Sequence, residues 1–266
     1  MIVALGVVIS RELKKTFRQK SRLLASLVRP LIWLFVIGGG IGSIVPSDSN
    51  SNYQQAIVPG ILGMTLLFGS MLSALTTVYD KESGVMRMFI ISPMSSYGII
   101  LSKLVSSTIA GIVQVIGLLI ILFSLSIVDV GQIHIPLFIF GLICTALTCS
   151  TIGLITAVLS KSLDNFAAIM NFVIFPVFFL SGALYPIDNL PPALHWVAVA
   201  NPFSYGVDLI KHSITSVSVT PDFGKVSDTI VLFVFTILGV TFSSWRFSQE
   251  STSAALVSIL SKGRKS

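Results

Sequence analysis

Six long apolar runs dominate this sequence and restrict what it can fold into. They cover residues 23–45, 56–78, 99–128, 135–159, 166–184 and 230–247. A helix needs about 20 apolar residues to cross the hydrocarbon layer of a bilayer, and each run is near or beyond that length. The chain is 53% hydrophobic and only 11% charged, whereas soluble domains carry about 25% charged residues. The runs therefore predict an all-α polytopic membrane protein with six transmembrane helices in a single domain, residues 1–266.

The basic residues gather near the two chain ends. Seven Lys and Arg residues lie within the first 29 positions and four at or after position 246, while only Lys211 and Lys225 lie in connections on the predicted outer side. Cytoplasmic connections are enriched in Lys and Arg, so both termini are predicted to be cytoplasmic. The pattern indicates contact with membrane lipids and no nucleic-acid binding. We expect no cleaved signal peptide, because the first run is longer than the apolar core of such a peptide.

The N-terminal segment, residues 1–22, is predicted to form an amphipathic helix in the membrane interface. Ile9, Leu13 and Phe17 recur at helical spacing and form an apolar stripe. Basic residues occupy the other faces, namely Arg11, Lys14, Lys15 and Arg18. The same basic residues also serve to fix the orientation of the chain in the membrane.

The segment before the last run, residues 186–223, is too apolar for a free loop. Pro192 begins one short helical pattern, and Asn201-Pro202 separates it from a second. Each piece has about 10–14 residues, too few to span a membrane. We predict short re-entrant helices that form an outer gate, with Pro192, Asn201 and Pro202 as its candidate residues.

The runs contain uncharged polar residues. Gln114 and the Ser and Thr residues of 145–156 are expected to join helices through hydrogen bonds. Asn171 lies among aromatic residues, and a substrate path for an amphipathic molecule is predicted there, lined by Asn171, Phe175, Phe178 and Phe179. Aromatic residues that face lipid explain the same pattern equally well. The sequence contains no catalytic motif, no ATP-binding loop and no metal-ligand spacing.

The predicted cytoplasmic connection holds a short apolar stretch, residues 80–94. Val85, Met86 and Phe89 are apolar but lie outside any predicted span. An exposed apolar helix needs a partner to cover it, so this segment is predicted to dock into a groove of another protein.

The motif E-x-G-x-M-R-x-x-x-x-S-P, from Glu82 to Pro93, resembles the coupling segment of ABC transporter type-2 permeases. The segment 178–210 resembles a second hallmark of that family, and the N-terminal basic helix resembles its interfacial helix. The likeness extends over the whole chain. One departure is visible, because many members carry Thr and then an acidic residue after the glycine, where this chain has Val85 and Met86.

The resemblance implies the membrane subunit of an ATP-driven exporter in the inner or plasma membrane. Two copies of an ABC ATP-binding subunit would bind the coupling segment, and a second permease subunit would complete a homodimer. The coupling residues implied are Glu82, Gly84, Met86, Arg87, Phe89, Ser92 and Pro93. The chain itself is expected to be no enzyme and to bind no cofactor, with ATP and magnesium held by the partner. Drugs, lipids and lipid-linked or free polysaccharides are the implied substrates.

Two other functions would need features that the sequence does not show. A self-contained membrane enzyme or scaffold that acts on lipids would need a catalytic cluster near a leaflet surface. A passive channel would need a polar stripe through the spans, which are too apolar for a wide aqueous pore.

Overall fold

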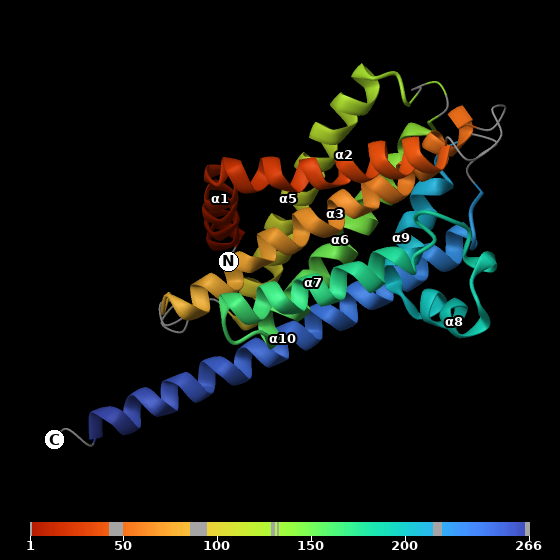
Figure 1. Cartoon of the computed structure of the whole chain (residues 1–266). Helices are drawn as coiled ribbons and strands as arrows, with labels where there is room; N and C mark the ends of the chain where they lie inside the picture. The colour runs from red at the N-terminus through yellow and green to blue at the C-terminus, as the bar shows by residue number, and fades with distance from the viewer. Residues whose placement is uncertain are drawn as a thin grey trace.

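The computed structural model describes residues 2–42, 50–85, 95–128, 131, 133–214 and 220–263. These residues are mainly helical, with an isolated antiparallel bridge between Ile133 and Ile214. The helices are α1 (Ile2–Arg18), α2 (Lys20–Gly42), α3 (Asn50–Glu82), α5 (Ser96–Ser124), α6 (Ile135–Leu159), α7 (Leu163–Phe179), η3 (Ile187–Asn189), α8 (Pro192–Ala200), α9 (Pro202–Lys211) and α10 (Lys225–Gly263). The predicted all-α fold is confirmed (Figure 1).

Four helices of the described chain are long and apolar enough to cross a membrane. They are Gln55–Glu82, Ser96–Ser124, Ile135–Leu159 and Lys225–Gln249, which correspond to the second, third, fourth and sixth predicted spans. The first and fifth predicted spans coincide with the shorter apolar helices Ser26–Gly40 and Leu163–Phe179. Six crossings and the side on which each terminus lies stay predictions.

Helix α3 lies at the centre of the bundle. It packs against α2, α5, α6 and α7. Its apolar residues point to all sides, as expected for a helix that protein surrounds. Gly60 allows the closest approach, because a Cβ atom there would overlap the backbone carbonyl of Ala183. The helix runs from the end of the molecule that holds α8 to the opposite end, which holds α1 (Figure 1).

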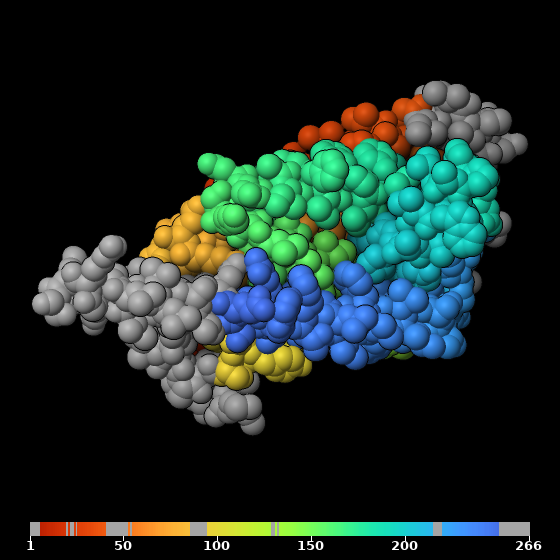
Figure 2. Space-filling model, turned by 90° about the horizontal axis from the view of Figure 1, so that it is seen from below, coloured from red at the N-terminus to blue at the C-terminus, as the bar shows by residue number. Residues whose placement is uncertain are grey.

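Helix α10 lies on the outside of the bundle (Figure 2). It packs against α5, α6 and α9, and its other face is apolar and exposed. The exposed side chains of that face include Val226, Ile230, Phe233, Val234, Ile237 and Leu238. An apolar face of this length is suited to contact with lipid.

Buried hydroxyl and amide groups join the helices. Ser26 of α2 donates to Gln114 of α5 over 2.7 Å, and Thr108 of α5 donates to Ser150 of α6 over 3.1 Å. Thr145 of α6 donates to the Gly206 carbonyl of α9 over 3.0 Å. The predicted helix-joining role of Gln114 and the Ser/Thr set is therefore confirmed at these positions.

Candidate functional site

A buried group of charged side chains links three helices at the α1 end of the bundle. Lys103 Nζ of α5 lies 2.7 Å from Asp80 Oδ2 of α3 and 3.5 Å from Glu12 Oε1 of α1. Lys15 Nζ lies 3.1 Å from Asp80 Oδ1, and an Arg11 guanidinium nitrogen lies 3.6 Å from the same oxygen. We call these five residues the Lys103 cluster.

The three central side chains of the Lys103 cluster are buried. The side chains of Glu12, Asp80 and Lys103 are only 2–3% exposed, so water screens their charges little. A buried charge is strongly unfavourable without a partner, and here each carboxylate contacts the same ammonium group. The cluster therefore fixes α1, α3 and α5 relative to one another at one point.

The last turn of α3 is also attached to two further helices. Lys81 Nζ donates to the Val158 carbonyl near the end of α6 over 2.9 Å. Glu82 Oε1 accepts from the Leu163 backbone N–H at the start of α7, also over 2.9 Å. The segment that begins at Asp80 thus starts where contacts to α1, α5, α6 and α7 converge.

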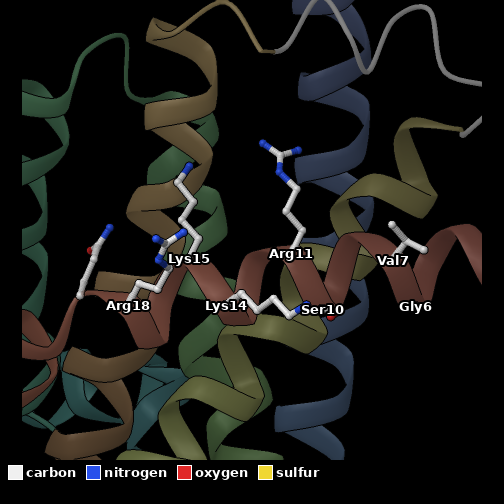
Figure 3. A pocket seen from close by; sticks show the side chains of 8 residues that line it. Gly6, Val7, Ser10, Arg11, Lys14, Lys15 and Arg18 are labelled. Carbon is white, nitrogen blue, oxygen red and sulfur yellow. The ribbon is translucent and has the colours of Figure 1, made fainter.

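The exposed face of α1 is basic. Arg11, Lys14 and Arg18 are exposed, and Arg11 and Lys15 extend from the same side of the helix (Figure 3). A hollow of about 800 Å³ lies along this face, lined by Gly6, Val7, Ser10, Arg11, Lys14, Lys15, Arg18 and Gln19. Such a surface suits anionic groups of a lipid or of a protein.

The face of α1 that packs against the bundle differs from its predicted apolar stripe. Among residues 6–18 of this helix, the buried side chains are those of Glu12 and Thr16, whereas Ile9 and Leu13 are partly buried and Phe17 is exposed. Glu12 is buried because it reaches Lys103, and the apolar stripe remains available to the membrane interface.

The two short helices at the α8 end form where they were predicted. Helix α8 begins at Pro192, and Asn201 separates it from α9, whose first residue is Pro202. Asn201 is buried, donates to the Val177 carbonyl over 2.7 Å and accepts from the Phe203 N–H over 3.1 Å. Asn201 therefore ends one helix, starts the next and attaches both to α7.

Comparison with known proteins identifies the family of this chain. Residues 3–215 match the family model described as ABC-2 type transporter. The chain belongs to the ABC-2 type transporter family. The inner membrane transport permease YadH of Escherichia coli strain K12 is 24% identical over 237 residues, which cover 87% of this chain and 91% of YadH. Nodulation protein J of Rhizobium leguminosarum bv. viciae is 23% identical over 194 residues, covering 71% of this chain and 73% of that protein.

Family membership supports a membrane-embedded transport permease subunit. Of the predicted coupling residues in this ABC-2 permease, Glu82 is exposed and caps α7, and Gly84 has a positive φ of 71° that suits glycine. The remaining five lie outside the described residues, namely Met86, Arg87, Phe89, Ser92 and Pro93. Their role stays a prediction.

The predicted substrate-path residues on α7 differ in burial, although the rings of Phe175 and Phe179 stack with their centroids 6.2 Å apart. Phe178 is buried and Phe179 is partly buried, and their ring centroids lie 6.4 Å and 5.4 Å from that of Trp33 in α2. Asn171 and Phe175 are exposed on the outer face of the helix. The four residues therefore line no common enclosed cavity within the described part of one chain.

A second charged group, which the sequence analysis missed, lies at the α8 end. Asp208 and His212 are one turn apart at the end of α9, and Asp228 joins them from the first turn of α10. Burial raises the pKa of Asp208, against the hydrogen bonds from the backbone N–H groups of Asp222 and Phe223 that lower it. We call Asp208, His212 and Asp228 the Asp228 cluster.

Proposed function

We propose that this chain is the membrane-spanning subunit of an ATP-driven exporter. Separate ATP-binding subunits would hydrolyse ATP with magnesium and dock on residues 80–94 and on the basic face of α1. The observation that carries the proposal is the Lys103 cluster, because it stands where α3 leads into the coupling segment.

The contacts of the last turn of α3 would transmit a motion of the coupling segment to other helices. A partner that displaces residues 80–94 would move the end of α3, to which those residues are directly joined. Since Asp80 and Glu12 share Lys103, this motion would pass to α1 and α5 together. Lys81 and Glu82 would carry it to the ends of α6 and α7.

The transported molecule is proposed to be amphipathic, such as a drug, a lipid or a polysaccharide with or without a lipid carrier. Asn171 offers one polar group beside the exposed rings of Phe172 and Phe175 on the outer face of α7. A second copy of the permease facing this surface would enclose a path of mixed polarity, so we propose a homodimer with both termini in the cytoplasm.

Reconstitution with the ATP-binding subunit tests the proposal. We expect ATP-dependent transport into inverted vesicles, and we expect Met86→Asp and Arg87→Glu to abolish it without reducing membrane insertion. Glu82→Gln keeps an oxygen that accepts from Leu163 and removes only the charge, whereas Glu82→Ala removes both. Loss of transport in both Glu82 variants indicates a charge contact with the partner, and loss in the alanine variant alone indicates the helix cap.

Asp164 provides the matched control. It is an exposed acidic residue in the first turn of α7, at the same end of the bundle as Glu82. Asp164→Asn should transport like the unmodified protein. Normal transport by the Met86, Arg87 and both Glu82 variants would refute the assignment of the coupling segment.

A further inference from the structure

Asp228 is a buried carboxylate that lacks a hydrogen-bond donor. The residue is 0% exposed, and neither of its side-chain oxygens has a hydrogen-bond partner. Such a group is costly to bury as an anion unless a proton or a cation compensates its charge. The neighbouring cation, Lys211, is already paired with Asp222, with 2.5 Å between Nζ and Oδ2. Lys211 therefore does not compensate Asp228, which must bind either a proton or another cation.

The atoms around Asp228 converge on one point. His212 Nε2 lies 3.6 Å from Asp228 Oδ2, 3.5 Å from Asp208 Oδ2 and 3.0 Å from the Phe223 carbonyl oxygen. Ligands bound to zinc at about 2.0–2.1 Å in a tetrahedron lie about 3.3 Å from one another. The three separations from the imidazole nitrogen are close to that value, and ligand atoms of Asp208, His212 and Asp228, one from each residue, lie within 4.8 Å of one another. These distances are compatible with ligands of one small metal ion.

The charge and accessibility of the site also suit a cation. Asp208, Asp222 and Asp228 supply three buried carboxylates against the single ammonium of Lys211. The carboxyl groups outnumber the ammonium group, so the site favours the binding of a cation. The His212 side chain is 14% exposed, while those of Asp208 and Asp228 are 1% and 0% exposed, so access is on the imidazole side.

We propose that Asp208, His212 and Asp228, with the Phe223 carbonyl, form a binding site for a divalent transition-metal cation such as Zn²⁺. One imidazole nitrogen among oxygen donors favours zinc over magnesium, which prefers oxygen ligands alone. The bound ion would fasten the end of α9 to the first turn of α10. It would thereby hold the short-helix segment against the last predicted span. The site does not depend on the exporter proposal, because none of its atoms belongs to the Lys103 cluster.

Thermal unfolding of the purified full-length chain in detergent tests the site. The protein is first treated with EDTA and then given Zn²⁺, Mn²⁺ or Mg²⁺ in separate samples. We expect zinc at about 100 times its Kd to raise Tm by about 5 °C or more, and Mg²⁺ to leave it unchanged. Elemental analysis of the zinc-treated, desalted protein should find about one zinc per chain if the three side chains bind it.

Substitutions distinguish this site from adventitious binding. His212→Gln and Asp228→Asn should each abolish the zinc-dependent rise in Tm. His195→Gln, which changes a histidine of α8 in the same segment, should keep it. If Asp228→Asn fails to fold, His212→Gln decides the question. The proposal is overturned if zinc leaves the Tm of the unmodified chain unchanged, or raises that of His212→Gln equally.

Discussion

Replacing Lys103 with methionine removes the shared cation of the Lys103 cluster and keeps much of the side-chain volume. Glu12 then loses its contact at 3.5 Å, and its other oxygen, Oε2, already lacks a hydrogen-bond partner. Asp80 is compensated in part, because Lys15 remains 3.1 Å away. Removing one partner of a buried ion pair costs about 3–5 kcal/mol. Because Asp80 keeps its contact with Lys15, we expect Lys103→Met to lose about 3 kcal/mol of folding stability, the lower end of this range.

The corresponding change in Tm is large enough to measure in detergent. About 1 kcal/mol shifts the Tm of a chain of this size by about 2–4 °C, so Lys103→Met should unfold about 6–12 °C below the unmodified protein. Adding Glu12→Gln to Lys103→Met removes the uncompensated carboxylate. The double variant should therefore recover about 1 kcal/mol of the lost stability.

Lys161 is the matched control for this experiment. It is an exposed lysine at the same end of the bundle, so Lys161→Met should change Tm by about 1 °C or less. The reasoning fails if Lys103→Met behaves like Lys161→Met. It also fails if Glu12→Gln lowers the stability of the Lys103→Met protein further, because Glu12 would then be stabilised by something other than Lys103.

Three further predictions follow from other parts of the fold. Gly60→Ala should lower Tm by several degrees because its methyl group meets a fixed carbonyl, whereas Gly39→Ala, which has open space around it, should raise or keep Tm. Asn201→Ala should be destabilised by about 1–3 kcal/mol, because it loses both the cap of α9 and the hydrogen bond to the Val177 carbonyl; an unfolding temperature equal to that of the unmodified protein would contradict this. In intact cells an impermeant maleimide should label Asp188→Cys and not Lys161→Cys; the reverse result would show that the predicted orientation is wrong.

Patterns local in the sequence predicted much of the fold. Apolar runs located the four long helices, because helix length and hydropathy are properties of contiguous residues. Asn201-Pro202 located the break between α8 and α9, since proline has no N–H to continue a helix and asparagine caps the next one. Helix α3 extends beyond the predicted span 56–78 at both ends, and it continues to Glu82 through the charged residues Asp80 and Lys81.

The Lys103 cluster and the Asp228 cluster could not be predicted from patterns of neighbouring residues in the sequence. Asp80 was predicted only as the first residue of the coupling segment 80–94. Nothing in the sequence indicates that Glu12 and Lys103, which are 91 positions apart, share one buried contact. The spacing of Asp208 and His212 was visible as one helical turn. Their meeting with Asp228 depends on how α10 packs beside α9, which only the fold determines.

The enclosure of α3 limits how this protein can change shape. Helix α3 contacts its neighbours along most of its length, so sliding it along its axis would disrupt all those interfaces at once. Peripheral helices such as α10 have one exposed face, so they can tilt while disrupting fewer helix contacts. Opening and closing should therefore tilt α3 at its Glu82 end and pivot the outer helices around it, with no sliding of α3 along its own axis.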